Sequence, residues 1–186
     1  MILPIYAYGQ PVLKKMGADI APDYPELKEL IENMWETMYN AEGVGLAAPQ
    51  IGRSIRLFVV DTIQIMEKGK ESEGIKQAFI NAYKVEEAGE LWTYEEGCLS
   101  IPEVRGDVDR LPQLRLRYLD ENFTEQEKVF SGINARVIQH EYDHIDGVLF
   151  IDHLKPIKKR MVRRKLDNIK KGKASVEYKM KFAVGR

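Results

Sequence analysis

Apolar residues recur with the period of an α-helix in three stretches of the chain. The first stretch predicts a helix over residues 25–39 that begins at a capping box formed by Asp23 and Glu26. The second predicts a helix over residues 131–147, and the third predicts a basic helix over residues 156–171. We expect each apolar stripe to pack into the core, with the opposite face of the helix in water.

Alternation of apolar and polar residues predicts several short strands between these helices. They are expected at residues 55–60, 78–85, 90–94, 113–119 and 127–130. Residues 176–184 alternate in the same way and predict a strand in the C-terminal tail, while the polar residues 63–76 predict a surface excursion. Because the helices and strands do not alternate as βαβ units, the order of elements predicts an α+β fold.

Composition is that of a soluble globular protein, with 44% apolar and 31% charged residues in a chain of 186. Neither an export signal nor a membrane span is recognisable near the N-terminus, and a single cysteine excludes an internal disulfide. We therefore expect a cytoplasmic protein. The net charge of −1 is unevenly distributed: residues 155–173 hold ten Lys/Arg and one acid, a net +9, so the remainder carries −10. This separation of charge indicates an acidic partner for the basic segment.

Two histidines lie one turn apart on the second predicted helix, and a glutamate directly follows the first. His140 and His144 share a helical face with Ile133 and Val137. Histidines four residues apart can bind one metal ion, and Glu141 can then act as a general base. A pair of half-buried structural histidines is the alternative, but this spacing with an adjacent glutamate has a chance of about a few in a thousand.

The types and spacing of the residues do not decide which residue is the third metal ligand. Phe150 stands where one class of protease has a third histidine, so that extended pattern fails. Downstream candidates that could return to the ion are Asp146, Asp152 and His153. Upstream, Cys98 is either a small buried apolar residue or a ligand. On physical grounds Cys98 is favoured over His153 as the third ligand. A metallopeptidase that binds its metal through His140, His144 and His153 is not excluded.

Three segments taken together are more specific than any one of them. GVGLAAPQIG (43–52), EGCLS (96–100) and QHEYDH (139–144) occur in this order, and the chain resembles the peptide deformylase family over roughly residues 1–170. The resemblance implies antiparallel sheets around a central helix that carries the HExxH-type motif. It also implies an enzyme that removes the N-formyl group from the N-terminal formylmethionine of nascent polypeptides and releases formate.

The resemblance also implies a role for each motif residue. The metal ligands would be Cys98, His140 and His144. Glu141 would be the acid–base residue, and the Gln50 side chain and the Leu99 backbone N–H would stabilise the oxyanion. The family's metal is typically Fe²⁺, and Zn²⁺, Ni²⁺ or Co²⁺ can replace it.

Substrate contacts are expected from both the resemblance and the apolar face of the motif helix. Gly43 and Gly45 fit a segment along which an extended peptide can add as a strand. Val44 is expected to line the methionine pocket. The full expected set of substrate-binding residues is Gly43, Val44, Gly45, Glu96, Arg105, Ile133 and Val137. Two positions depart from the family: Ala82 replaces a usual proline, and Arg136 replaces an apolar residue of the methionine pocket.

The expected organisation is a catalytic domain over residues 1–153, a basic helix over residues 154–172 packed on it, and a strand-like tail over residues 173–186. The family resemblance implies that the basic segment, residues 155–173, contacts the ribosome. A solvated amphipathic helix and a separate RNA-binding module are the alternatives for this segment. No membrane partner and no specific DNA partner are expected.

Overall fold

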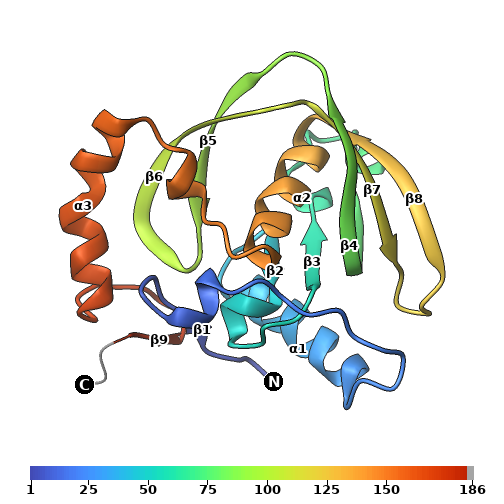
Figure 1. The fold of residues 1–186 in the computed structure, drawn as a ribbon, viewed down its shortest axis with the longest axis horizontal. Coiled ribbons are helices and arrows are strands. Elements are labelled where there is room, and N and C mark those ends of the chain that lie inside the picture. Colours follow the sequence, from blue (N-terminus) through green and yellow to red (C-terminus); the bar gives the residue numbers. More distant parts are fainter. Residues whose placement is uncertain (184–186) are drawn as a thin grey trace.

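The computed structural model describes residues 1–183, which form three α-helices and nine β-strands (Figure 1). The helices are α1 (Leu27–Asn40), α2 (Gly132–Ile145) and α3 (Pro156–Lys170). The strands are β1 (Ile5–Tyr6), β2 (Gly45–Ala47), β3 (Leu57–Asp61), β4 (Lys76–Ala88), β5 (Trp92–Cys98), β6 (Ile101–Arg110), β7 (Gln113–Leu119), β8 (Glu125–Ser131) and β9 (Met180–Lys181). The predicted α+β class is confirmed.

The largest sheet contains five antiparallel strands in the order β2-β3-β4-β7-β8. Strand β3 is buried along its whole length because the sheet is covered on both faces. Leu57 and Val59 point into the core shared with α1, whereas Phe58 and Val60 point into the core shared with α2. The continuous apolar run of β3 follows from this two-sided burial.

A separate antiparallel hairpin, β5–β6, lies between α2 and α3 (Figure 1). Val104 and Val108 of β6 pack with Val162 and Ile169 of α3 in a third core cluster. This packing holds the hairpin against the C-terminal helix and brings the end of β5 beside α2. Cys98 is the last residue of β5, so the hairpin determines where the chain's thiol lies.

Helix α2 lies between the large sheet and the hairpin and is buried on most sides. The predicted central helix is therefore confirmed. The chain leaves it through Gly147, which has a φ of 75° and lies against the backbone of Lys14. A Cβ at this glycine would lie 2.8 Å from the Lys14 carbonyl carbon, so both the conformation and the close approach require glycine.

The predicted capping box of α1 is wrong. Glu26 precedes the helix in the left-handed region at a φ of 56°, and it forms no side-chain capping hydrogen bond. The helix begins only at Leu27, two residues later than predicted. The stripe of buried residues, which includes Met34 and Met38, is confirmed as core.

Two strand predictions also differ from the structure. Strand β6 was not predicted, because Pro102, Gly106 and five charged residues hide an alternation that is clear in its burial. The tail strand is shorter than predicted: only Met180–Lys181 form a strand, paired in parallel with β1. Val184, which belongs to the predicted strand, lies outside the described residues.

Residues 63–76 form a largely exposed excursion with two short 3₁₀ helices, Ile63–Ile65 and Glu71–Glu73, as predicted. Ala82, at the position where the family usually has proline, is buried in β4, and its carbonyl accepts two hydrogen bonds from Arg56. Among the described residues, no helix is long and apolar enough to cross a bilayer.

Candidate metal centre

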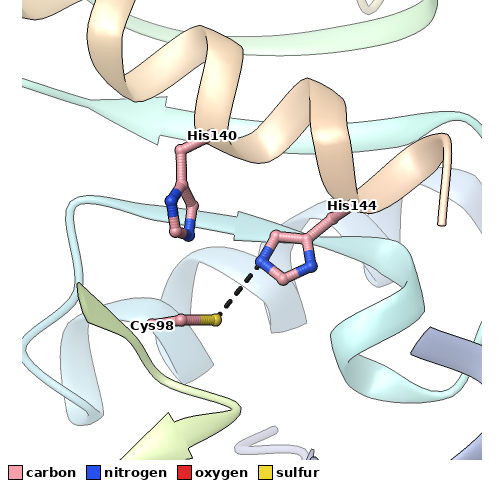
Figure 2. Close-up of side chains that lie close together, drawn as sticks. All are labelled: Cys98, His140 and His144. Carbon is pink, nitrogen blue, oxygen red and sulfur yellow. Dashed lines mark hydrogen bonds between the residues drawn. The ribbon is translucent and has the colours of Figure 1, made fainter. Parts of the chain in front are cut away.

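Three potential ligands converge where the β5–β6 hairpin meets α2 (Figure 2). Cys98 Sγ lies 3.3 Å from His144 Nε2, and the ligand atoms of Cys98, His140 and His144 all lie within 4.8 Å of one another. The histidines point from one face of α2 toward the thiol, as their four-residue spacing requires. A thiol and two imidazoles at this separation form a donor set suited to one divalent transition metal ion.

The alternative third ligand points elsewhere. His153 Nε2 lies 2.9 Å from Asp143 Oδ2, and the His153 side chain is more than one-third exposed. The choice that the residues alone left open thus has a geometric answer: the structure brings Cys98, and not His153, to the two motif histidines. The buried His144 Nδ1 has no hydrogen-bond partner among the described residues.

A buried carboxylate orients the first histidine. Glu96 Oε2 lies 3.0 Å from His140 Nδ1, so the other ring nitrogen of His140 is directed to the ligand cluster. Glu96 also accepts hydrogen bonds from Arg110 Nε at 2.7 Å and Arg136 Nη1 at 3.0 Å. Burial opposes ionisation of Glu96, but the hydrogen bonds from His140 and Arg110 outweigh it and hold its pKa well below the usual value. Glu96 is therefore a fixed anion behind His140.

The same network extends to residues that the sequence did not single out. Arg110 Nη1 donates to Asp143 Oδ2 at 2.8 Å, and Asp143 in turn contacts His153. Asp143 lies inside the histidine motif, one residue before His144. Its charge on a buried helix was the signal that could have identified it as part of the network. Arg110 ends β6, a strand that was itself not predicted.

The Glu141 carboxylate is buried beside the ligand cluster, and its Oε2 has no hydrogen-bond partner among the described residues. Burial raises the pKa of Glu141 to about 7, although the neighbouring His140 opposes the shift. Gly45 faces this carboxylate so closely that a Cβ there would lie 2.5 Å from Glu141 Oε1. A carboxyl group in this environment can both accept and return a proton near neutral pH.

Gln50 directs its amide nitrogen toward the cysteine. Its Oε1 accepts the Ala47 N–H at 2.9 Å, which determines the orientation of the amide. Its Nε2 then lies 3.2 Å from Ser100 Oγ and 3.5 Å from Cys98 Sγ. A preorganised donor thus lies beside the ligand cluster, and the oxyanion role that the family resemblance implies for Gln50 stays a prediction.

A pocket of about 500 Å³ opens beside Cys98, His140 and Glu141. It is lined by all seven predicted substrate-binding residues: Gly43, Val44, Gly45, Glu96, Arg105, Ile133 and Val137. Arg105 lies exposed at the rim and pairs with Glu95 at 2.9 Å. Ile65 and Tyr94 also line the pocket and were not predicted. Ile65 comes from the excursion, where Gln64 Nε2 donates to the Gly43 carbonyl at 2.9 Å.

Arg136, which departs from the family's apolar residue, also lines the pocket, but its charge is bound by the hairpin. Besides Glu96, its guanidinium donates to the Val108 carbonyl at 2.9 Å and the Trp92 carbonyl at 2.6 Å. It also lies over the Trp92 ring at 4.4 Å. The guanidinium is thus paired with an anion and two carbonyls, so the departure does not place an unpaired charge in the methionine pocket.

Comparison with known proteins decides among the alternatives. The sequence model of the Polypeptide deformylase family matches residues 2–160. The chain is 55% identical to a peptide deformylase of Flavobacterium johnsoniae, covering 100% of this chain and 98% of the relative. It is 54% identical to a peptide deformylase of Christiangramia forsetii, covering 98% and 96%. The chain belongs to the peptide deformylase family.

Solved structures agree with this family assignment. A peptide deformylase from Plasmodium falciparum superposes with a TM-score of 0.82 at 33% identity, covering 90% of this chain and 95% of that one. Family membership makes the chain a metal-dependent hydrolase that removes the N-formyl group from nascent polypeptides. The predicted family is confirmed, and the alternative of a metallopeptidase acting on internal peptide bonds is set aside.

Proposed function

We propose that deformylation takes place in the pocket between β2 and β5, with one divalent metal ion held by Cys98, His140 and His144. The observation that carries this proposal is the convergence of the three ligand atoms within 4.8 Å on the pocket wall. A metal ion bound there supplies Lewis-acid chemistry and lowers the pKa of water. Fe²⁺ is our choice for the native ion, with Zn²⁺, Ni²⁺ or Co²⁺ able to replace it.

In this proposal Glu141 moves the protons. Its carboxylate accepts a proton from the water that attacks the formyl carbon and delivers it to the departing amine nitrogen. A pKa raised to about 7 by burial suits a group that must both take and give a proton. Gly45 leaves the space in which this carboxylate lies beside the pocket.

Gln50 Nε2 and the Leu99 N–H are the proposed donors to the formyl oxygen as negative charge develops on it. Donors that are already oriented before the reaction are typically worth about 3–4 kcal/mol each. The hydrogen bond from Ala47 N–H to Gln50 Oε1 supports this role, because it keeps Nε2 directed toward Cys98.

The substrate peptide is proposed to add along β2, which is an edge strand of the five-stranded sheet. Gly45 begins this strand and Gly43 lies two residues before it, while Val44, Ile133 and Val137 would receive the methionine side chain. Glu96 was expected to bind substrate, but its carboxylate is occupied by His140 and two arginines. We therefore assign Glu96 a positioning role through His140.

Anaerobically purified protein should release formate from a formyl-Met-Ala peptide and leave an acetyl-Met-Ala peptide intact. The matched substrates differ only in the acyl group, so they separate deformylation from general amide hydrolysis. Glu141→Gln should lower kcat by at least about 100-fold and retain the bound metal. Equal cleavage of both peptides, or a fully active Glu141→Gln enzyme, would exclude this mechanism.

We also propose that α3 contacts the ribosome and that the enzyme works in the cytoplasm, where formylated chains emerge. Val162 and Ile169 pack α3 onto the body, while its arginines and most of its lysines are exposed. The basic surface therefore faces outward, as electrostatic binding to ribosomal RNA requires. Residues 1–153, 154–172 and 173–186 are proposed to act as catalytic domain, ribosome-contacting helix and tail.

A further inference from the structure

The C-terminal tail reaches the metal centre through one tyrosine. Tyr178 Oη donates a hydrogen bond to the Leu99 carbonyl at 2.7 Å. Its ring packs against the core formed by α1 and the large sheet. Leu99 directly follows Cys98, so a residue near the end of the chain contacts the turn that carries a proposed metal ligand and a proposed oxyanion donor.

Leu99 and Ser100 form the tight turn that joins β5 to β6. Ser100 is held twice, because its carbonyl accepts the Tyr8 N–H at 2.8 Å and its hydroxyl accepts Gln50 Nε2 at 3.2 Å. Leu99 is held by Tyr178. The residue that carries the proposed oxyanion donor is therefore contacted by the tail as well as held between the paired residues Cys98 and Ile101 of its own hairpin.

The tail can hold this turn because it is itself paired with the N-terminal segment. Ile5 N–H donates to the Lys179 carbonyl at 2.9 Å, directly after Tyr178, and Ala7 N–H donates to the Lys181 carbonyl at 2.9 Å. Gln10 Nε2 adds a hydrogen bond to the Phe182 carbonyl at 2.7 Å. Tyr178 thus lies two residues before β9, in a segment that is anchored to the N-terminal residues at several points.

We propose that Tyr178 is a positioning residue that aligns the Leu99 backbone for catalysis. The inference rests on the proposed function, because it assumes that the Leu99 N–H donates to the developing oxyanion. The hydrogen bond to the Leu99 carbonyl holds the peptide plane that follows the Leu99 Cα, and this limits how far the Leu99 N–H on the other side of that Cα can turn. A catalytic donor must keep its orientation within about 10–20° to be effective.

Tyr178→Phe removes the hydroxyl and keeps the ring in its place. We expect kcat for a formyl-Met peptide to fall about five- to tenfold, which corresponds to the loss of one hydrogen bond. KM and metal content should stay unchanged, because neither the pocket walls nor the ligands are altered. Hydrogen exchange at the Leu99 and Ser100 amides should become faster in the metal-loaded protein, which reports on the turn without using activity.

Tyr6→Phe is the matched control. Tyr6 lies on β1, the strand that pairs with β9 of the tail, and its hydroxyl accepts a hydrogen bond from Lys181 Nζ at 3.2 Å. It loses a hydroxyl without affecting Leu99, so its kcat and its exchange at residues 99 and 100 should match those of the wild type. A similar fall in kcat for both variants would show only that the pairing of β1 with the tail had been disturbed, and it would overturn the role of Tyr178.

Two further outcomes are distinguishable. If the wild type releases formate and Tyr178→Phe matches it in kcat and in exchange at the turn, the role of Tyr178 is overturned and the proposed function stands. If the wild type releases no formate from the metal-loaded chain, the proposed function is overturned, and the inference falls with it.

Discussion

At the scale of single residues, the proposed base depends on a missing side chain. Glu141 lies where a Cβ on Gly45 would need to be, at 2.5 Å from Oε1. Glu141 is buried in the last two turns of α2, so its carboxylate has little room to move aside. The glycine of the first motif therefore serves the base of the third motif, in addition to any contact with the substrate.

Gly45→Ala should lower kcat by about 100-fold, because displacement of a catalytic group by about 1 Å has an effect of this size. Gly43→Ala is the comparison, since its Cβ would meet the end of the flexible Leu99 side chain at 2.8 Å, which can move more easily. Steady-state kinetics with equal metal content would separate the two. A Gly45→Ala enzyme with the kcat of the wild type would show that the carboxylate is not confined as described.

Single residues also show what the sequence could and could not predict. His140, His144 and Glu141 were predictable because their relation depends only on helical spacing. The spacing of residues alone did not decide the third ligand, since the positions of Cys98 and His153 depend on how the β5–β6 hairpin packs; only the family resemblance named Cys98. The same limit applies to Arg110, whose partners Glu96 and Asp143 are distant in sequence.

At the scale of elements, one arginine connects the hairpin to the central helix. Arg136 on α2 contacts Trp92 and Glu96 of β5 and Val108 of β6. Because these contacts are buried, they hold the strand that carries Cys98 against the helix that carries the histidines. From the sequence, Arg136 was recognisable only as a departure from the family, since none of its partners lies near it in the chain.

Arg136→Met should lower the free energy of unfolding by about 2–4 kcal/mol, because it removes one partner of a buried ion pair and leaves two carbonyls unpaired. Arg105→Met is the matched control on the same hairpin. It breaks an exposed pair with Glu95 and should cost about 1 kcal/mol or less. Urea unfolding of proteins with the same metal content measures both. Equal costs for the two variants would contradict the role of Arg136 as a clamp.

Element boundaries were predicted less well than element types, for local physical reasons. The helices followed their apolar stripes, but the left-handed conformation of Glu26 shifted the start of α1. Strand β6 was missed because its buried residues alternate with charges around Gly106. The tail forms its short strand by pairing with β1, a partner almost the full length of the chain away.

At the scale of the whole molecule, β1 and β9, which belong to the N-terminal and C-terminal segments, pair beside the reactive turn, and the basic helix α3 lies next to them (Figure 1). The charge separation found in the sequence becomes a basic surface on α3, and the acidic remainder forms the body. The division of the chain into catalytic domain, basic helix and tail stays a prediction.

Replacement of Arg160, Arg163 and Arg164 with Gln should weaken ribosome binding and lessen its dependence on salt, by about one unit of slope for each lost phosphate contact. These side chains are exposed on α3, so folding should not change. A triple variant of the exposed Lys28, Lys68 and Lys128 to Gln alters the net charge equally, away from α3. Co-sedimentation with ribosomes at several salt concentrations measures both, and equal losses would rule out a specific contact by α3.

The ligand assignment is tested most directly by the metal content of two variants purified anaerobically. Cys98→Ala should lose most of the bound metal and the formate-releasing activity, because it removes one of three converging ligands. His153→Ala should retain about one ion per chain and most of its activity, since His153 contacts Asp143 and not the cluster. Full metal content in Cys98→Ala, together with a His153→Ala protein that binds no metal, would contradict the assignment of Cys98 as the third ligand.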